Sequence, residues 1–152
     1  GVSSAASDVY KRQYLFNNEY EAGLIEQRTG WDEAEVLQHV GIRVTTLGKN
    51  GVRITSADGL DVHVPVAQER VIQDPTGVGD AFRAGFITGL QWGITLEQCA
   101  QVGSLLATYV LETVGTQEFT LDRDDFLARL EESYGPQVAQ DIQQHINAVP
   151  TR

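Results

Sequence analysis

Hydrophobic positions along the chain follow two different periods, which predicts a mixture of strands and helices. Residues 14–16 form a short apolar run typical of a strand, and residues 42–47 form a β-branched run, bounded by glycines, typical of a buried strand. Residues 51–55 and 60–66 flank Ala57-Asp58-Gly59, in which Asp-Gly is a strong hairpin signal. Residues 60–66 alternate apolar and polar side chains, so we expect one buried face and one solvated face.

Helical spacing predicts further elements between and after these strands. A helix over residues 21–28 is expected to stop near Gly30, and Asp32 is a suitable cap for a second helix that ends at about Val40. Four more helices are predicted at residues 81–92, from a Thr95 cap to about 113, at 124–134 and at 138–146. Expected inward positions are Ala34, Val36, Leu37, Val40, Phe82, Phe86, Leu90, Leu96, Cys99, Val102, Leu106 and Val110. These elements indicate an α/β layered fold in which the four C-terminal helices cover the sheet.

Charge and cysteine content restrict the function. The net charge of −10 argues against nucleic acid or an anionic membrane as a partner, because both need a basic face. A phosphate ligand would have to be held locally, by backbone dipoles or a metal, against this overall field. The single cysteine, Cys99, excludes an internal disulfide and is expected to be a small buried hydrophobe. No apolar run approaches the ~18 residues that span a bilayer.

The N-terminal residues show no amphipathic period. Within residues 1–13, the stretch from Asp8 to Gln13 is similar to the translated end of a sequencing transposon, so we expect a non-native segment, with a disordered native tail as the alternative. The chain contains no methionine, and we expect it to be a piece of a longer protein. Three scattered histidines without ligand spacing are expected at the surface, namely His39, His63 and His145.

The most informative stretch is residues 74–82, Asp-Pro-Thr-Gly-Val-Gly-Asp-Ala-Phe, where a loop turns into an apolar helix. Backbone N–H groups at such a point form an anion site, and the helix dipole adds positive potential. A carboxylate such as Asp80 is unfavourable inside an anion site unless it has a chemical role. One such role is to accept a proton from a hydroxyl group beside a bound phosphate. The alternative is an ordinary acidic residue in the first turn of a helix. Spacing excludes the P-loop, because Gly79 is not followed by Lys-Ser/Thr, and the dinucleotide fingerprint, because Phe82 replaces its third glycine.

Residues 74–86 resemble the C-terminal signature of the ribokinase-like, or PfkB, carbohydrate kinases. Three other segments agree in order. Asn18-Glu19-Tyr20-Glu21 resembles the family's Asn-x-x-Glu element, Thr46-Leu47-Gly48-Lys49-Asn50-Gly51 its nucleotide turn, and Val114-Gly115-Thr116-Gln117 its Gly-x-Gln segment. The signature together with residues 112–117 looks most like bacterial adenosine-kinase-type members, with ribokinase or another sugar kinase as the near alternative.

This resemblance implies roles for the residues of the signature. Asp80 would be the general base, and the backbone N–H groups of Gly77, Val78 and Gly79 would form the anion hole for the transferred phosphoryl group. Asp74 and Thr76 would belong to a monovalent-cation site, for potassium, near the Val114 and Gly115 carbonyls. Arg83, just behind the base, would either help neutralise phosphate or lie on the helix surface.

Other residues would hold the nucleotide and its metal. Asn18 and Glu21 would hold magnesium through its waters, with a helix cap as the alternative. Thr46, Gly48 and Gly51 would contact the nucleotide, and Ser104 stands where the family commonly has an adenine-contacting residue, with a structural serine as the alternative.

The resemblance implies that residues 14–152 are the C-terminal, nucleotide-binding part of a three-layer α/β/α kinase domain with a mostly parallel sheet and a β-hairpin. The implied activity is ATP- and Mg²⁺-dependent phosphorylation of an alcohol group of a sugar or nucleoside, in a cytoplasmic protein whose full-length form is a homodimer. Sugar contacts and a lid would lie in an N-terminal half that nothing here resembles, so we expect the chain alone to be inactive. A non-catalytic nucleotide-binding or interaction module is the alternative.

We predict that the isolated chain is poorly stable or self-associates. A sheet without its first strands has an open hydrogen-bonding edge and uncovered apolar surface. Sedimentation and thermal unfolding of the purified chain measure this directly. A monomer with a single cooperative transition at high temperature would contradict the prediction.

Overall fold

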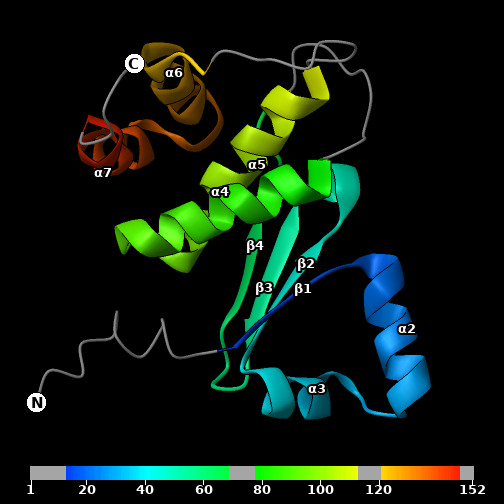
Figure 1. Cartoon of the computed structure of the whole chain (residues 1–152). Helices are drawn as coiled ribbons and strands as arrows, with labels where there is room; N and C mark the ends of the chain where they lie inside the picture. Colours follow the sequence, from blue (N-terminus) through cyan, green and yellow to red (C-terminus); the bar gives the residue numbers. More distant parts are fainter. Residues whose placement is uncertain (1–12, 69–77, 113–120, 148–152) are drawn as a thin grey trace, which may run out of the picture. The chain divides into compact units, whose positions relative to one another are not determined.

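The computed structural model describes residues 13–68, 78–112 and 121–147 (Figure 1). Contacts divide the chain into two compact units, Gly1–Pro65 and Val66–Arg152. Most of the segment expected to be non-native lies outside the described residues. Its last residue, Gln13, is described, and its carbonyl oxygen accepts a hydrogen bond from the Ile42 N–H at 3.2 Å.

The first unit contains a four-stranded mixed sheet in the order β1-β2-β3-β4. The strands are β1 (Tyr14–Asn18), β2 (Ile42–Thr46), β3 (Val52–Ser56) and β4 (Asp61–Val64), which confirms the predicted strands and the hairpin (Figure 1). Only β1 and β2 pair in parallel, whereas β2–β3 and β3–β4 are antiparallel. The expected mostly parallel sheet is therefore wrong for the described strands. The reason is that the connections after β2 and β3 are too short for the crossover that a parallel pair requires.

Two helices connect the parallel strands β1 and β2. The second has the predicted bounds, and the first begins two residues earlier and ends one residue later than predicted. In α2 (Glu19–Thr29), Asn18 caps the first turn and Gly30 ends the helix in the left-handed conformation, at φ 74°. In α3 (Glu33–Val40), the Asp32 side chain accepts a hydrogen bond from the Glu35 N–H. Ala34 is exposed rather than inward, because 3.6 residues per turn put it about a third of a turn from the middle of the buried stripe. That stripe consists of Val36, Leu37 and the half-buried Val40.

Polar side chains lie between this sheet and its two connecting helices. Arg43 on β2 is 3% exposed, pairs with Glu26 of α2 at 3.6 Å and donates to the Ala22 carbonyl at 3.2 Å. Arg53 on β3 pairs with Glu33 of α3 and Asp61 of β4. Its guanidinium lowers the pKa of the exposed Asp61 carboxyl by hydrogen bonding. The opposite face of the central strands is apolar, with Ile42, Val44 and Ile54 fully buried.

The second unit consists of four helices in its described residues: α4 (Val78–Trp92), α5 (Leu96–Glu112), α6 (Arg123–Tyr134) and α7 (Pro136–Asn147). All four predicted helices are confirmed, although the predicted end at residue 113 lies outside the described residues. Helix α5 is the centre, and it is buried on most of its circumference between Cys99 and Tyr109. Leu96, Leu106 and Val110, which were expected inward, are only half-buried. None of the described helices combines the length and apolar character that crossing a membrane requires.

Helix α6 is attached to α5 through Arg129. Its guanidinium makes two hydrogen bonds with the Glu112 carboxylate, at 2.8 and 2.7 Å, and one with the Gln68 carbonyl at 3.1 Å. It also lies 4.7 Å from the centre of the Tyr109 ring. The pair is almost fully removed from water, so removing either partner would leave an uncompensated charge, at a cost of about 3–5 kcal/mol.

Helices α4 and α5 approach each other through glycines. A Cβ atom on Gly85 would lie 2.7 Å from the Gly103 Cα, and one on Gly103 would lie 2.6 Å from the Phe82 carbonyl oxygen. At Gly89, a Cβ would lie 2.8 Å from the Cys99 Sγ. Real Cβ atoms do not come this close, so these three positions require glycine for packing rather than for backbone conformation.

We predict that Gly103→Ala destabilises the chain by about 1–3 kcal/mol, because the added methyl group meets backbone that has no room to move. Chemical denaturation monitored by circular dichroism measures the change. The control is Gly23→Ala in α2, where nothing lies within 4 Å of the added atom and alanine is the better helix former. Equal stability of the Gly103 variant and the parent chain would contradict the close approach.

We also predict that Cys99 does not react with thiol reagents at pH 8 while the protein is folded. Burial raises the pKa of its thiol to about 12, so almost no thiolate is present at pH 8. The side chain is 0% exposed, which confirms the expected buried cysteine. Reaction with a chromogenic disulfide, followed with and without denaturant, tests this. Rapid labelling of the folded chain would show that α4 and α5 do not shield the sulfur.

Candidate functional site

Asp80 lies in the first turn of α4 and is exposed, together with Gly79. The helix is anchored by the buried Phe82 and Phe86, which come from the apolar positions that the sequence pattern identifies. The N–H groups of a first turn have no acceptor within their own helix, and the helix dipole favours an anion there. Among the described residues, no atom lies within 4 Å of a Cβ atom built on Gly79. Gly77, Asp74 and Thr76 lie outside the described residues.

Asn18 and Glu21 form a capping box at the start of α2. The Asn18 Oδ1 accepts from the Glu21 N–H at 2.7 Å, and the Glu21 Oε1 accepts from the Asn18 N–H at 2.9 Å. This is the helix-cap alternative that the sequence left open. Both side chains are exposed, and a carboxylate has further lone pairs that a water of hydrated Mg²⁺ can donate to, so the cap does not compete with the magnesium role.

The structure brings the magnesium and nucleotide candidates together. In the parallel ladder Asn18 is paired with Thr46, at the carboxyl ends of β1 and β2. A short 3₁₀ turn, η1 (Gly48–Asn50), follows, and all three of its residues are exposed. Ligands of open α/β sheets bind beyond the carboxyl ends of the strands, so this edge of the first unit is suited to a nucleotide.

Gly51 has to be glycine. Its φ of 94° is left-handed, and a Cβ atom would lie 2.2 Å from the Val64 carbonyl oxygen. The turn at residues 46–51, the candidate nucleotide turn, therefore lies directly against the end of β4.

Ser104 lies inside the second unit. Its side chain is buried on α5, and its Oγ accepts a hydrogen bond from the Ala67 N–H at 3.0 Å. This hydrogen bond agrees with the alternative that Ser104 is a structural residue. Its proposed contact with adenine stays a prediction. The segment Val114-Gly115-Thr116-Gln117 lies outside the described residues.

Two polar residues near the nucleotide turn were not identified as site residues from the sequence. Asn17, at the end of β1, is buried and its Oδ1 accepts from the Thr45 hydroxyl at 2.9 Å. Its Nδ2 has no hydrogen-bond partner among the described residues. His63 lies within hydrogen-bond distance of the Asn50 carbonyl oxygen. Neither residue belongs to a motif, and both contacts arise from strand pairing rather than from sequence proximity.

In the described ranges, no group of three or more His, Cys, Asp or Glu side chains is placed to hold a metal ion. The histidines expected at the surface divide into two groups. His39 and His63 are exposed, whereas His145 is half-buried with its ring stacked on Trp92.

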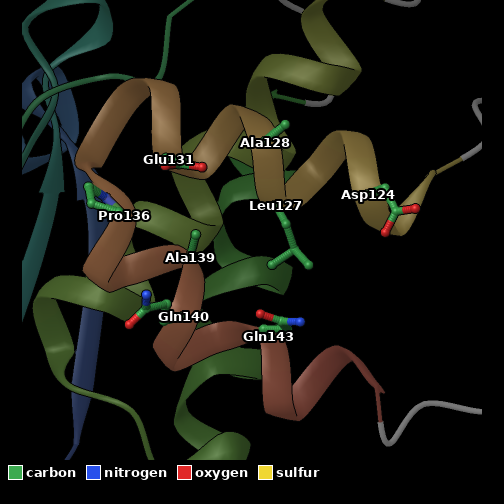
Figure 2. A pocket seen from close by; sticks show the side chains of 8 residues that line it. All are labelled: Asp124, Leu127, Ala128, Glu131, Pro136, Ala139, Gln140 and Gln143. Atoms are coloured by element: carbon green, nitrogen blue, oxygen red, sulfur yellow. The ribbon is translucent and has the colours of Figure 1, made fainter.

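The second unit also has a hollow of about 320 Å³ between α6 and α7 (Figure 2). Figure 2 shows the Leu127 side chain extending toward Gln143 across it. Its lining consists of Asp124, Leu127, Ala128, Glu131, Pro136, Ala139, Gln140 and Gln143. None of these is a candidate site residue, and the lining offers no basic group for a phosphate.

Known proteins resemble this chain over most of its length. A nucleoside kinase of Methanocaldococcus jannaschii is 30% identical over 118 residues, which are 78% of this chain and 39% of the relative. An inositol 3-kinase of Arabidopsis thaliana is 35% identical over 89 residues, or 59% of this chain and 25% of the relative.

Among solved structures, the Burkholderia thailandensis nucleoside kinase in complex with inosine superposes with a TM-score of 0.75 at 32% identity. It covers 81% of this chain, which in turn covers 40% of the nucleoside kinase. The adenosine kinase of Sinorhizobium meliloti, at 21% identity and a TM-score of 0.61, shares the fold. The chain thus spans about two fifths of the length of the nucleoside kinases it matches.

A family model for pfkB family carbohydrate kinases matches residues 4–123. This range contains the signature at residues 74–86 and the three accompanying segments, from which the sequence predicted the same family. The chain belongs to the pfkB family of carbohydrate kinases.

Proposed function

We propose that the protein containing this chain transfers the γ-phosphate of ATP to a hydroxyl group of a nucleoside or sugar. Family membership supports a kinase, and the relatives named as nucleoside kinases support the acceptor class. Because the chain spans about two fifths of those relatives, the activity belongs to the longer protein. The chain alone is proposed to be inactive, since the acceptor contacts are expected outside it.

The observation that carries this proposal is the exposed Asp80 in the first turn of α4, next to the exposed Gly79. Asp80 accepts the proton of the acceptor hydroxyl while that oxygen forms a bond to the γ-phosphorus. The bond between the γ-phosphorus and the bridging oxygen breaks, and ADP leaves with the electron pair. Backbone N–H groups of Gly77, Val78 and Gly79 stabilise the charge on the transferred group. Such a reaction depends mainly on positioning and charge neutralisation.

The nucleotide is proposed to bind the turn at residues 46–51, with Ser104 as a further contact. A chain with a net charge of −10 repels a polyphosphate, so Mg²⁺ near Asn18 and Glu21 would supply the neutralisation that the side chains do not. Asp74 and Thr76 would hold K⁺ beside the anion hole. A cytoplasmic location and a homodimer of the longer protein are part of the same proposal.

A nucleoside is the preferred acceptor. The Burkholderia relative was solved with inosine, and it is 32% identical to this chain. The inositol 3-kinase of Arabidopsis is a relative that supports a cyclic polyol or sugar instead. Assays with inosine, ribose and myo-inositol separate these acceptor classes.

A non-catalytic nucleotide-binding module is the second candidate. The observation that favours it is the position of Asp80 in the first turn of α4, where an acidic residue is also expected without a catalytic role. Such a module would bind ADP without phosphate transfer, even in a protein of the relatives' full length.

We predict that Asp80→Asn in the longer protein lowers kcat by about 10²–10⁴-fold, because the acceptor hydroxyl loses its base. ATP affinity should be retained, since the amide occupies the same space. Steady-state kinetics and nucleotide titration measure the two effects separately.

The matched control is Asp124→Asn, which changes an exposed acid in the first turn of α6. If Asp80 served only as a first-turn acid, both variants would lose similar small amounts of stability and neither would lose turnover. Full turnover of the Asp80 variant would refute the assigned base, and absence of transfer by the unaltered longer protein would favour the non-catalytic module.

A further inference from the structure

The turn at residues 46–51, which is assigned to the nucleotide, makes a hydrogen bond with a side chain of β4. His63 lies on β4, and its Nε2 is 2.6 Å from the carbonyl oxygen of Asn50, the last residue of η1. A carbonyl oxygen only accepts hydrogen bonds, so the Nε2 atom must carry the proton and donate it. The contact links residues that are 13 positions apart and belong to no common motif.

The turn is also closed by its own backbone. The Asn50 N–H donates to the Leu47 carbonyl and the Gly51 N–H to the Gly48 carbonyl, both at 3.1 Å. The Leu47 N–H donates to the Gly51 carbonyl at 2.8 Å. These bonds set the internal shape of the turn, whose ends continue directly into the paired strands β2 and β3.

Two further contacts place the turn against β4. A Cβ atom on Gly51 would lie 2.2 Å from the Val64 carbonyl oxygen and 3.1 Å from the His63 Nε2. The first distance shows that the Gly51 backbone lies against the end of β4. The second shows that the His63 imidazole lies against Gly51, the last residue of the turn. Arg53, which pairs with His63 across the β3–β4 ladder, binds Asp61 and Glu33.

We infer that His63 is a positioning residue for the nucleotide, acting through its hydrogen bond to the Asn50 carbonyl. The inference rests on the proposed function, in which this turn meets the nucleotide. The three residues of η1 are exposed, so no core packing holds them in place. A turn that is already fixed before binding loses less conformational freedom when the nucleotide arrives, and this raises affinity.

The test uses variants that keep or remove a hydrogen-bond donor at the position of the His63 Nε2 atom. His63→Gln places an amide N–H close to the position of Nε2 and should keep the bond, whereas His63→Asn and His63→Ala should lose it. Asp61→Asn is the control, because Asp61 lies on the same strand and face and does not contact the turn. All four variants are made in the longer protein and compared with its unaltered form.

Two readouts are measured on each protein. Amide ¹H–¹⁵N shifts without nucleotide report the position of Gly48, Lys49 and Gly51, and titration with Mg²⁺–ADP gives the dissociation constant. One hydrogen bond of ordinary strength corresponds to about a three- to tenfold weaker affinity. We expect that loss, together with shifted turn amides, for His63→Ala and His63→Asn, and neither change for His63→Gln or Asp61→Asn.

The outcomes distinguish this inference from the proposed function. Unshifted turn amides in His63→Ala would overturn the inference, as would shifted amides with unchanged ADP affinity. Both results would leave nucleotide binding by the unaltered longer protein intact. Equal losses in His63→Gln and His63→Ala would also overturn the inference, because ring volume rather than the donated proton would then matter. Failure of the unaltered longer protein to bind Mg²⁺–ADP would refute the nucleotide assignment of the turn, and the inference with it.

Discussion

The close approach of α4 and α5 is the constraint on which the second unit depends. Glycines at positions 85, 89 and 103 let the two helices meet at backbone distance, where a single methyl group has no space. Because α5 is buried on most of its circumference, it serves as a fixed reference for α4. Helix α4 carries Asp80 in its first turn. The position of this proposed base is therefore fixed by the packing of α4 against α5, a contact that involves no charged group.

The first unit depends on a different constraint, the parallel pairing of β1 with β2. A parallel pair requires a long crossover, which α2 and α3 supply, and it puts the carboxyl ends of both strands at one edge. Asn18 and Thr46 meet there although 28 residues separate them in the chain. The buried Arg43, paired with Glu26, attaches α2 to the sheet and so fixes the capping box that contains Asn18 and Glu21.

Several candidate residues have a structural task in addition to their proposed chemical one. Asn18 and Glu21 accept hydrogen bonds from backbone N–H groups at the start of α2, and Ser104 accepts one from the Ala67 N–H inside the second unit. For the exposed pair the two tasks are compatible, because a carboxylate and an amide have lone pairs beyond those used in the cap. The buried Ser104 hydroxyl has less freedom, because it already accepts the hydrogen bond from the Ala67 N–H.

Local rules in the sequence were enough to determine most elements, their ends and the family. Caps at Asn18, Asp32 and Thr95, the Asp-Gly turn and the apolar periods act over a few residues, so a single chain reveals them. Burial needed the tertiary structure: Ala34 is exposed because neighbouring elements decide which side of a helix is covered. The sheet is mixed rather than mostly parallel because the connections after β2 and β3 are too short for a parallel crossover. The contact of His63 with the turn at residues 46–51 also could not be predicted from the sequence. It depends on the register of two antiparallel strand pairs, which brings together residues with no local relation.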